Sequence, residues 1–153
     1  MNKEINRAKI HEIAVQLMYS FLMLEETGNQ IDFEESVSLA CNLPYEECDL
    51  YLKEVLIKSL KHQKEIEIFV SKFLKNWEFS RLNTVIQAIF IISVAEYYFV
   101  EEKLTSAIII NNAVKFSKKF GDGGEKDYKY VNAVLQNCLK DENRTILLSN
   151  TSK

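Results

Sequence analysis

Apolar side chains recur at steps of three and four residues along most of the chain, which is the period of an amphipathic α-helix. The first stretch predicts a helix over about 5–26, because a polar run containing Gly28 then stops the pattern. Later stretches predict five more helices, at about 33–42, 44–75, 80–98, 105–121 and 127–139. The pattern therefore predicts an all-α protein.

Residues that favour helix starts support these limits. Pro44 stands at the predicted start of the third helix, and acidic residues follow it, as the helix dipole favours. Ser80 and Thr105 are N-cap types and are predicted to begin the fourth and fifth helices, with Trp77 at the joint between the two halves of the chain.

The predicted fourth helix is apolar on nearly every side from Leu82 to Val94, so we expect it to be the central helix of the fold. Glu96 falls on its apolar side without a second acid or histidine at a recognisable spacing. The sequence therefore predicts a buried glutamate held by backbone donors or a cation, and not a catalytic acid.

The 153 residues, 47% of them hydrophobic, are enough for one compact domain. We expect this domain to occupy residues 1–141. Residues 142–153 have no sustained period and are predicted to form a flexible C-terminal tail.

The formal net charge is −3, which argues against a protein that grips nucleic acid by bulk electrostatics. The charge is unevenly distributed, however. Residues 25–54 hold nine acids against one base, whereas residues 115–129 hold five lysines against three acids. Any contact with nucleic acid is therefore expected to be local.

Several classes of protein are disfavoured. Three cysteines without CxxC spacing suggest neither a disulfide framework nor a zinc site, and a reducing cytoplasm fits them best. The N-terminus has no secretory cleavage pattern, and the apolar run 85–100 is interrupted and too short for a membrane span. No phosphate loop, HExxH motif or catalytic triad is present, so we predict no catalytic residue, no metal, no cofactor and no enzyme activity.

Some aromatic and basic residues lie off the predicted core faces. Tyr19 projects almost opposite the apolar stripe of the first helix, and Arg7, Lys9 and His11 lie in the same N-terminal region. Single exposed rings and lysine-rich helix faces in contact with solvent are common in proteins. The competing explanation is therefore that these residues bind no ligand.

The same grouping recurs around the glycine loop near residue 121. The outer side of the fifth helix is predicted to carry polar and basic residues, with Phe120 at its margin: Asn111, Asn112, Lys115, Lys118 and Lys119. In the sixth helix, Lys129 and Tyr130 lie off the core face. Rings beside cations suit unpaired RNA bases, which stack for about 1–3 kcal/mol each.

We therefore predict a site for single-stranded RNA made of nine residues, namely Arg7, Lys9, His11, Tyr19, Lys118, Lys119, Phe120, Lys129 and Tyr130. The net negative charge predicts modest affinity for RNA alone and a need for a basic partner.

Three segments resemble the NusB family of bacterial transcription antitermination factors. They are RAKIHEIAVQLMYS near the start, WEFSRLNTVIQAIFIISVAEY in the middle, and SAIIINNAVKFSKKFG followed by YKYVNAVL. The resemblance implies an all-α, NusB-like fold of about six to seven helices in two small packed bundles.

It also implies a function. The chain would pair with the small-subunit ribosomal protein NusE, bind the boxA element of nascent ribosomal RNA transcripts, and act on the RNA polymerase elongation complex. By position, Tyr19, Phe120 and Tyr130 match the family's RNA-facing rings. The chain departs from the family at two places. Family members usually have several arginines before the tripeptide ARE, whereas this chain has only Arg7, Lys9 and His11 there. Asn112 stands where the family pattern INEA has glutamate.

Two other hypotheses use different chemistry. The chain could be a helical adaptor or homodimer that binds no RNA and uses Phe90, Ile91 and Ile108 as its contact patch. NusB-like domains also precede RNA methyltransferase domains, but 153 residues leave no room for a cofactor-binding sheet.

Overall fold

The protein is all-α, as predicted, in the part that its computed structural model describes, residues 3–75 and 78–151. The helices are α1 (Lys3–Glu26), α2 (Phe33–Cys41), α3 (Leu50–Lys61), α4 (Gln63–Ser71), α5 (Thr84–Tyr98), α6 (Ser106–Phe120), α7 (Gly124–Cys138) and α8 (Arg144–Thr151), with 3₁₀ turns η1 (Tyr45–Glu47), η2 (Phe79–Arg81) and η3 (Asp141–Asn143). Trp77 lies outside the described residues. No helix in the described ranges is long and apolar enough to cross a membrane.

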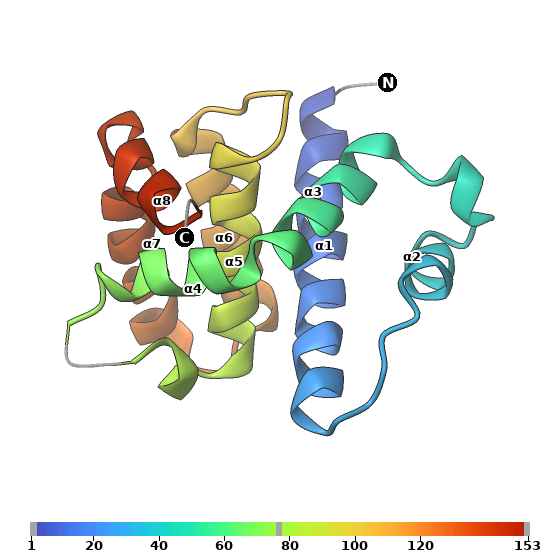
Figure 1. The fold of residues 1–153 in the computed structure, drawn as a ribbon, viewed down its shortest axis with the longest axis horizontal. Helices are drawn as coiled ribbons and strands as arrows, with labels where there is room; N and C mark the ends of the chain where they lie inside the picture. Colours follow the sequence, from blue (N-terminus) through green and yellow to red (C-terminus); the bar gives the residue numbers. More distant parts are fainter. Residues whose placement is uncertain (1–2, 76–77, 152–153) are drawn as a thin grey trace.

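Helix α5 is the centre of the fold, as its apolar sequence predicted. It packs against α1, α3, α4, α6 and α7, and Figure 1 shows it between α1 and α7, with α6 behind it. Phe90 and Ile91 on α5 are both 0% exposed. The contact patch of the adaptor hypothesis is therefore wrong, because two of its three residues are sealed in the core.

The single helix predicted over 44–75 is divided. Residues 45–47 form a 3₁₀ turn, and α3 begins after its N-cap Asp49. Helix α3 ends at Lys61 and α4 begins at Gln63, with His62 between them as the cap of both. The His62 ring stacks on Phe99 with 4.1 Å between centroids. The bend at His62 lets α3 and α4 both pack against α5. The apolar period in the sequence continues across His62, so the sequence pattern does not show where the helix is interrupted.

The predicted N-caps have different outcomes. Thr105 caps α6 by accepting a hydrogen bond from the Ile108 amide at 3.3 Å, as predicted. Ser80 does not cap α5, because it lies in the 3₁₀ turn η2. Asn83, nearer to the first core residue of α5, accepts from the Ile86 amide at 2.9 Å instead.

The C-terminal segment is not the irregular tail that its sequence predicted. Residues 144–151 form α8, which packs against α4. Leu147 is 0% exposed. The Arg144 guanidinium lies 5.1 Å from the centroid of the Tyr98 ring. A helix of about two turns with a single core leucine is too short to show a period, and the contact with α4 decides its conformation.

Candidate functional site

Two aromatic rings that the sequence places on outer faces are exposed in the structure. Tyr19 on α1 is 38% exposed and Phe120 at the end of α6 is 40% exposed. Lys119 donates a hydrogen bond to Oε1 of Glu12 at 3.0 Å, which joins α6 to α1 beside Phe120. Tyr19 follows Glu12 by seven residues, or two helical turns, so it lies on the same face of α1. Both rings therefore belong to the α1 and α6 face of the molecule.

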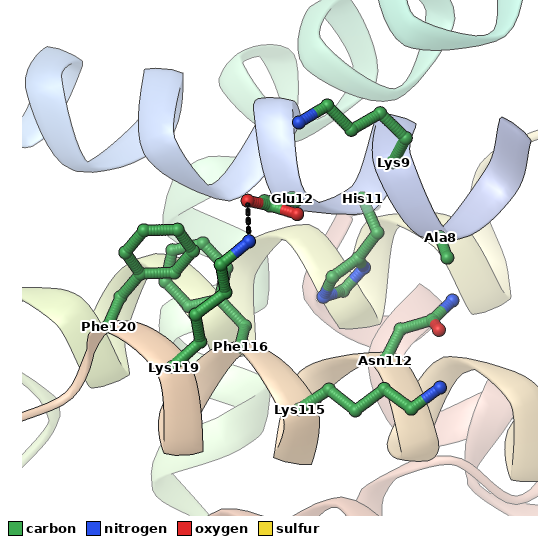
Figure 2. A pocket seen from close by; sticks show the side chains of 9 residues that line it. All are labelled: Ala8, Lys9, His11, Glu12, Asn112, Lys115, Phe116, Lys119 and Phe120. Atoms are coloured by element: carbon green, nitrogen blue, oxygen red, sulfur yellow. Dashed lines mark hydrogen bonds and ion pairs between the residues drawn. The ribbon is translucent and has the colours of Figure 1, made fainter. Parts of the chain in front are cut away.

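A pocket of about 340 Å³ opens between α1 and α6 next to Phe120 (Figure 2). It is lined by Ala8, Lys9, His11 and Glu12 of α1 and by Asn112, Lys115, Phe116, Lys119 and Phe120 of α6. Four of the residues predicted to bind RNA thus meet here: Lys9, His11, Lys119 and Phe120. The phenylalanines form its wall, and exposed lysines stand at its rim.

His11 lies at the inner end of this pocket and belongs to a buried hydrogen-bond network. Its side chain is 1% exposed, and Nδ1 lies 2.5 Å from Oε1 of Glu96. The other oxygen of Glu96 accepts a hydrogen bond from the Tyr51 hydroxyl at 3.0 Å. Burial, and then the nearby Glu96 carboxylate, raise the pKa of Tyr51, so the phenol keeps the proton that it donates.

This network confirms that Glu96 is a buried structural glutamate, 1% exposed, although side chains hold it and not backbone donors. The expectation that His11 stands at the surface with the other cations is wrong. Helices α5 and α6 cover this face of α1, and a covered face cannot be told from an exposed one in the sequence of α1 alone.

Arg7 is also placed differently from the prediction. Its side chain is 15% exposed, pairs with the Glu102 carboxylate, and lies 3.9 Å from the centroid of the Tyr51 ring. It does not line the pocket between α1 and α6. Arg7 thus supports the buried network from its Tyr51 side, and the cation that α1 offers to the pocket is Lys9.

The remaining predicted residues lie toward α7. The ammonium of Lys118 is 4.6 Å from the centroid of the Tyr128 ring, and Lys129 pairs with Glu125 at 2.5 Å, one turn away. Tyr128 and Lys129 line a second groove, of about 360 Å³, between α6 and α7. Lys118 and Lys129 are exposed, as predicted, but neither lines the pocket beside Phe120, and Lys129 lines the second groove instead.

Tyr130, predicted as an outward ring, is partly buried against the core. Its centroid lies 6.3 Å from that of Phe90, and its hydroxyl is buried without a hydrogen-bond partner in the described part of the chain. Burial raises the pKa of this phenol. The ring packs on the core because α5 and α7 pack together, which covers the margin of the α7 core face.

Five pocket residues were missing from the predicted site, namely Ala8, Glu12, Asn112, Lys115 and Phe116. The predicted outer position of Asn112 is wrong, since it is 8% exposed under α1. Lys115 precedes Lys119 by four residues, and this spacing, which places both on one face, could have revealed it.

Comparisons with known sequences point to one family. The model of the NusB family matches residues 8–140. The transcription antitermination protein NusB of Ligilactobacillus salivarius is 33% identical over 137 residues, which cover 88% of this chain and 98% of that protein. The protein of the same name from Clostridium botulinum is 32% identical over 142 residues, covering 92% and 99%.

Solved structures have the same architecture. T. maritima NusB superposes with a TM-score of 0.73 at 18% identity, covering 94% of this chain and 96% of that one. NusB from Aquifex aeolicus gives a TM-score of 0.63 at 26% identity, covering 96% and 92%.

Proposed function

Because the chain belongs to the NusB family, we propose that it is a cytoplasmic transcription antitermination factor that binds single-stranded RNA of the boxA type. The observation that carries this proposal is the α1 and α6 face, where Tyr19 and Phe120 are exposed and where Lys9 and Lys115 line the pocket next to Phe120. Exposed rings stack unpaired bases, and lysines attract phosphates.

The proposal includes a basic protein partner. The chain has a net charge of −3, and one of the lysines on this face, Lys119, is already paired with Glu12. The RNA-binding energy available to the chain alone is therefore small. A basic ribosomal protein, NusE in this proposal, supplies the missing positive charge, and the pair acts on RNA polymerase during elongation.

The test is an RNA titration with single-ring variants. A fluorescent boxA-like RNA is titrated with the protein, with and without NusE, and anisotropy gives the affinity. We expect Tyr19→Ala and Phe120→Ala each to weaken binding by about 5- to 150-fold, because each removes one stacking platform. Both rings are exposed, so the unfolding midpoint should change little.

Leu39→Ala is the matched control. Leu39 is an exposed apolar residue, 74% exposed, on α2 and away from the pocket, and its loss should leave RNA affinity unchanged. Equal affinities for the wild type and the Tyr19→Ala, Phe120→Ala double variant would overturn the proposed RNA surface.

A further inference from the structure

The pocket between α1 and α6 contains a polar atom that no described residue satisfies. Nδ1 of His11 is engaged by Glu96 at 2.5 Å, whereas Nε2 is buried and has no hydrogen-bond partner within residues 3–75 and 78–151. Figure 2 shows the ring pointing from α1 toward α6, into the space beside Asn112, Lys115 and Phe116. Buried polar atoms are nearly always paired, so an unpaired one that faces a pocket is a position at which a ligand atom can bind.

The network behind the ring fixes which nitrogen faces the pocket. Glu96 accepts the Nδ1 proton of His11 and is itself held by Tyr51 at 3.0 Å. Nε2 is then the nitrogen left to meet a ligand: it accepts from an N–H or O–H group when the ring is neutral and donates to an oxygen when the ring is protonated, and the edge of a base offers both kinds of partner.

The other walls narrow the chemistry of the ligand. Asn112, 8% exposed, offers an amide donor and an amide acceptor. Phe116 and Phe120 form an aromatic wall with their centroids 4.7 Å apart. Lys9 and Lys115 are exposed at the rim. A bare anion would leave the rings and the amide unused, and a purely apolar ligand would leave two buried polar groups unpaired.

A nucleobase with its phosphate uses all of these groups. Its face packs on phenylalanine, its edge carries N–H and carbonyl groups, and its phosphate reaches lysine. The volume of about 340 Å³ lies at the lower end of the range of about 300–1,000 Å³ that small-ligand pockets span.

We propose that this pocket takes up one unstacked base of the bound RNA and reads its edge through His11 Nε2 and the Asn112 amide. The proposal rests on the proposed function and adds to it one position at which the RNA sequence is read and not only stacked. Glu96 and Tyr51 act as positioning residues, because they orient the imidazole without reaching the RNA.

The first test follows the imidazole nitrogens by NMR in the full-length protein. The chain has two histidines, and His62, which stacks on Phe99 at the junction of α3 and α4, is the internal control. We expect a single-stranded boxA-like RNA to shift the Nε2 signal of His11 and to leave both His62 nitrogens in place. Nucleoside 5′-monophosphates should cause a smaller shift in the same direction, and ribose 5-phosphate, which lacks a base, should cause none.

The second test is a double-mutant cycle in RNA affinity. Asn112→Ala is used because it leaves the pair of His11 and Glu96 intact, and Asn111→Ala is its matched control, an exposed asparagine in the groove on the other side of α6. We expect Asn112→Ala to weaken binding of intact RNA about 5- to 10-fold. It should have no further effect on an RNA that is abasic at the position read by the pocket.

The outcomes separate the two proposals. If RNA binds and depends on Tyr19 and Phe120, but His11 Nε2 does not shift and no abasic position is coupled to Asn112, the base-reading pocket is wrong and the stacking surface stands. If ribose 5-phosphate shifts His11 as much as a nucleotide does, the pocket holds phosphate and not a base. If no RNA binds even with the partner, the proposed function falls and this inference falls with it.

Discussion

At the scale of single residues, the helical position of a ring does not decide whether it is available to a ligand. Tyr19 and Tyr130 both lie off the core stripe of their helices, yet Tyr19 is 38% exposed and Tyr130 packs against Phe90 with its hydroxyl buried. The difference comes from the neighbouring helices, because α5 lies against α7 on the side of Tyr130.

This contrast gives a prediction for Tyr130→Phe. The change removes a buried hydroxyl that has no described partner and keeps the ring that packs on Phe90. We expect the free energy of unfolding to stay the same or to rise by about 1 kcal/mol, and RNA affinity to stay within about twofold. Urea denaturation and RNA anisotropy measure the two quantities. A tenfold loss of RNA affinity would place Tyr130 in the RNA surface after all.

At the scale of helices and turns, apolar periodicity locates α1, α2, α6 and α7 to within about three residues at each end. The pattern fails where a local contact interrupts a helix without interrupting the apolar period. His62 is such a point, and the start of α5 is another, because Ser80 and Asn83 are both plausible caps by residue type.

The choice between the two caps of α5 is testable by substitution. Asn83→Ala removes the acceptor for the Ile86 amide and should lower the free energy of unfolding by about 0.5–2 kcal/mol. Ser80→Ala is the control and should change it by less than about 0.5 kcal/mol, because Ser80 offers Gln87 its backbone carbonyl and not its side chain. Equal losses in urea denaturation would show that Ser80 also stabilises the helix start.

At the scale of the whole molecule, the charge distribution is more informative than the net charge. The chain is acidic overall, but α1 and α6 bring Lys9, Lys115 and Lys119 to one face from positions about 100 residues apart. A net charge of −3 therefore does not exclude RNA binding. It does limit the number of phosphates that the chain can neutralise without its partner.

The salt dependence of RNA binding counts these phosphate contacts. With NusE present, Lys9→Ala and Lys115→Ala should each reduce the slope of log affinity against log salt by about 0.7, the value for one phosphate of a single strand. Lys64→Ala, an exposed lysine on α4, is the control and should leave the slope unchanged. Unchanged slopes in all three variants would mean that phosphates do not pass over the α1 and α6 face.

The sequence alone determined the fold class, the central place of α5, the burial of Glu96 and the exposure of Tyr19 and Phe120, because each depends on spacing within one helix. Only the tertiary structure decided which predicted site residues share a pocket. His11 and Asn112 become buried pocket residues because α1 and α6 cover each other, and Tyr130 becomes partly buried because α5 meets α7. Helical periodicity records which side chains share a face, whereas the partner that covers the face is set by packing between distant segments.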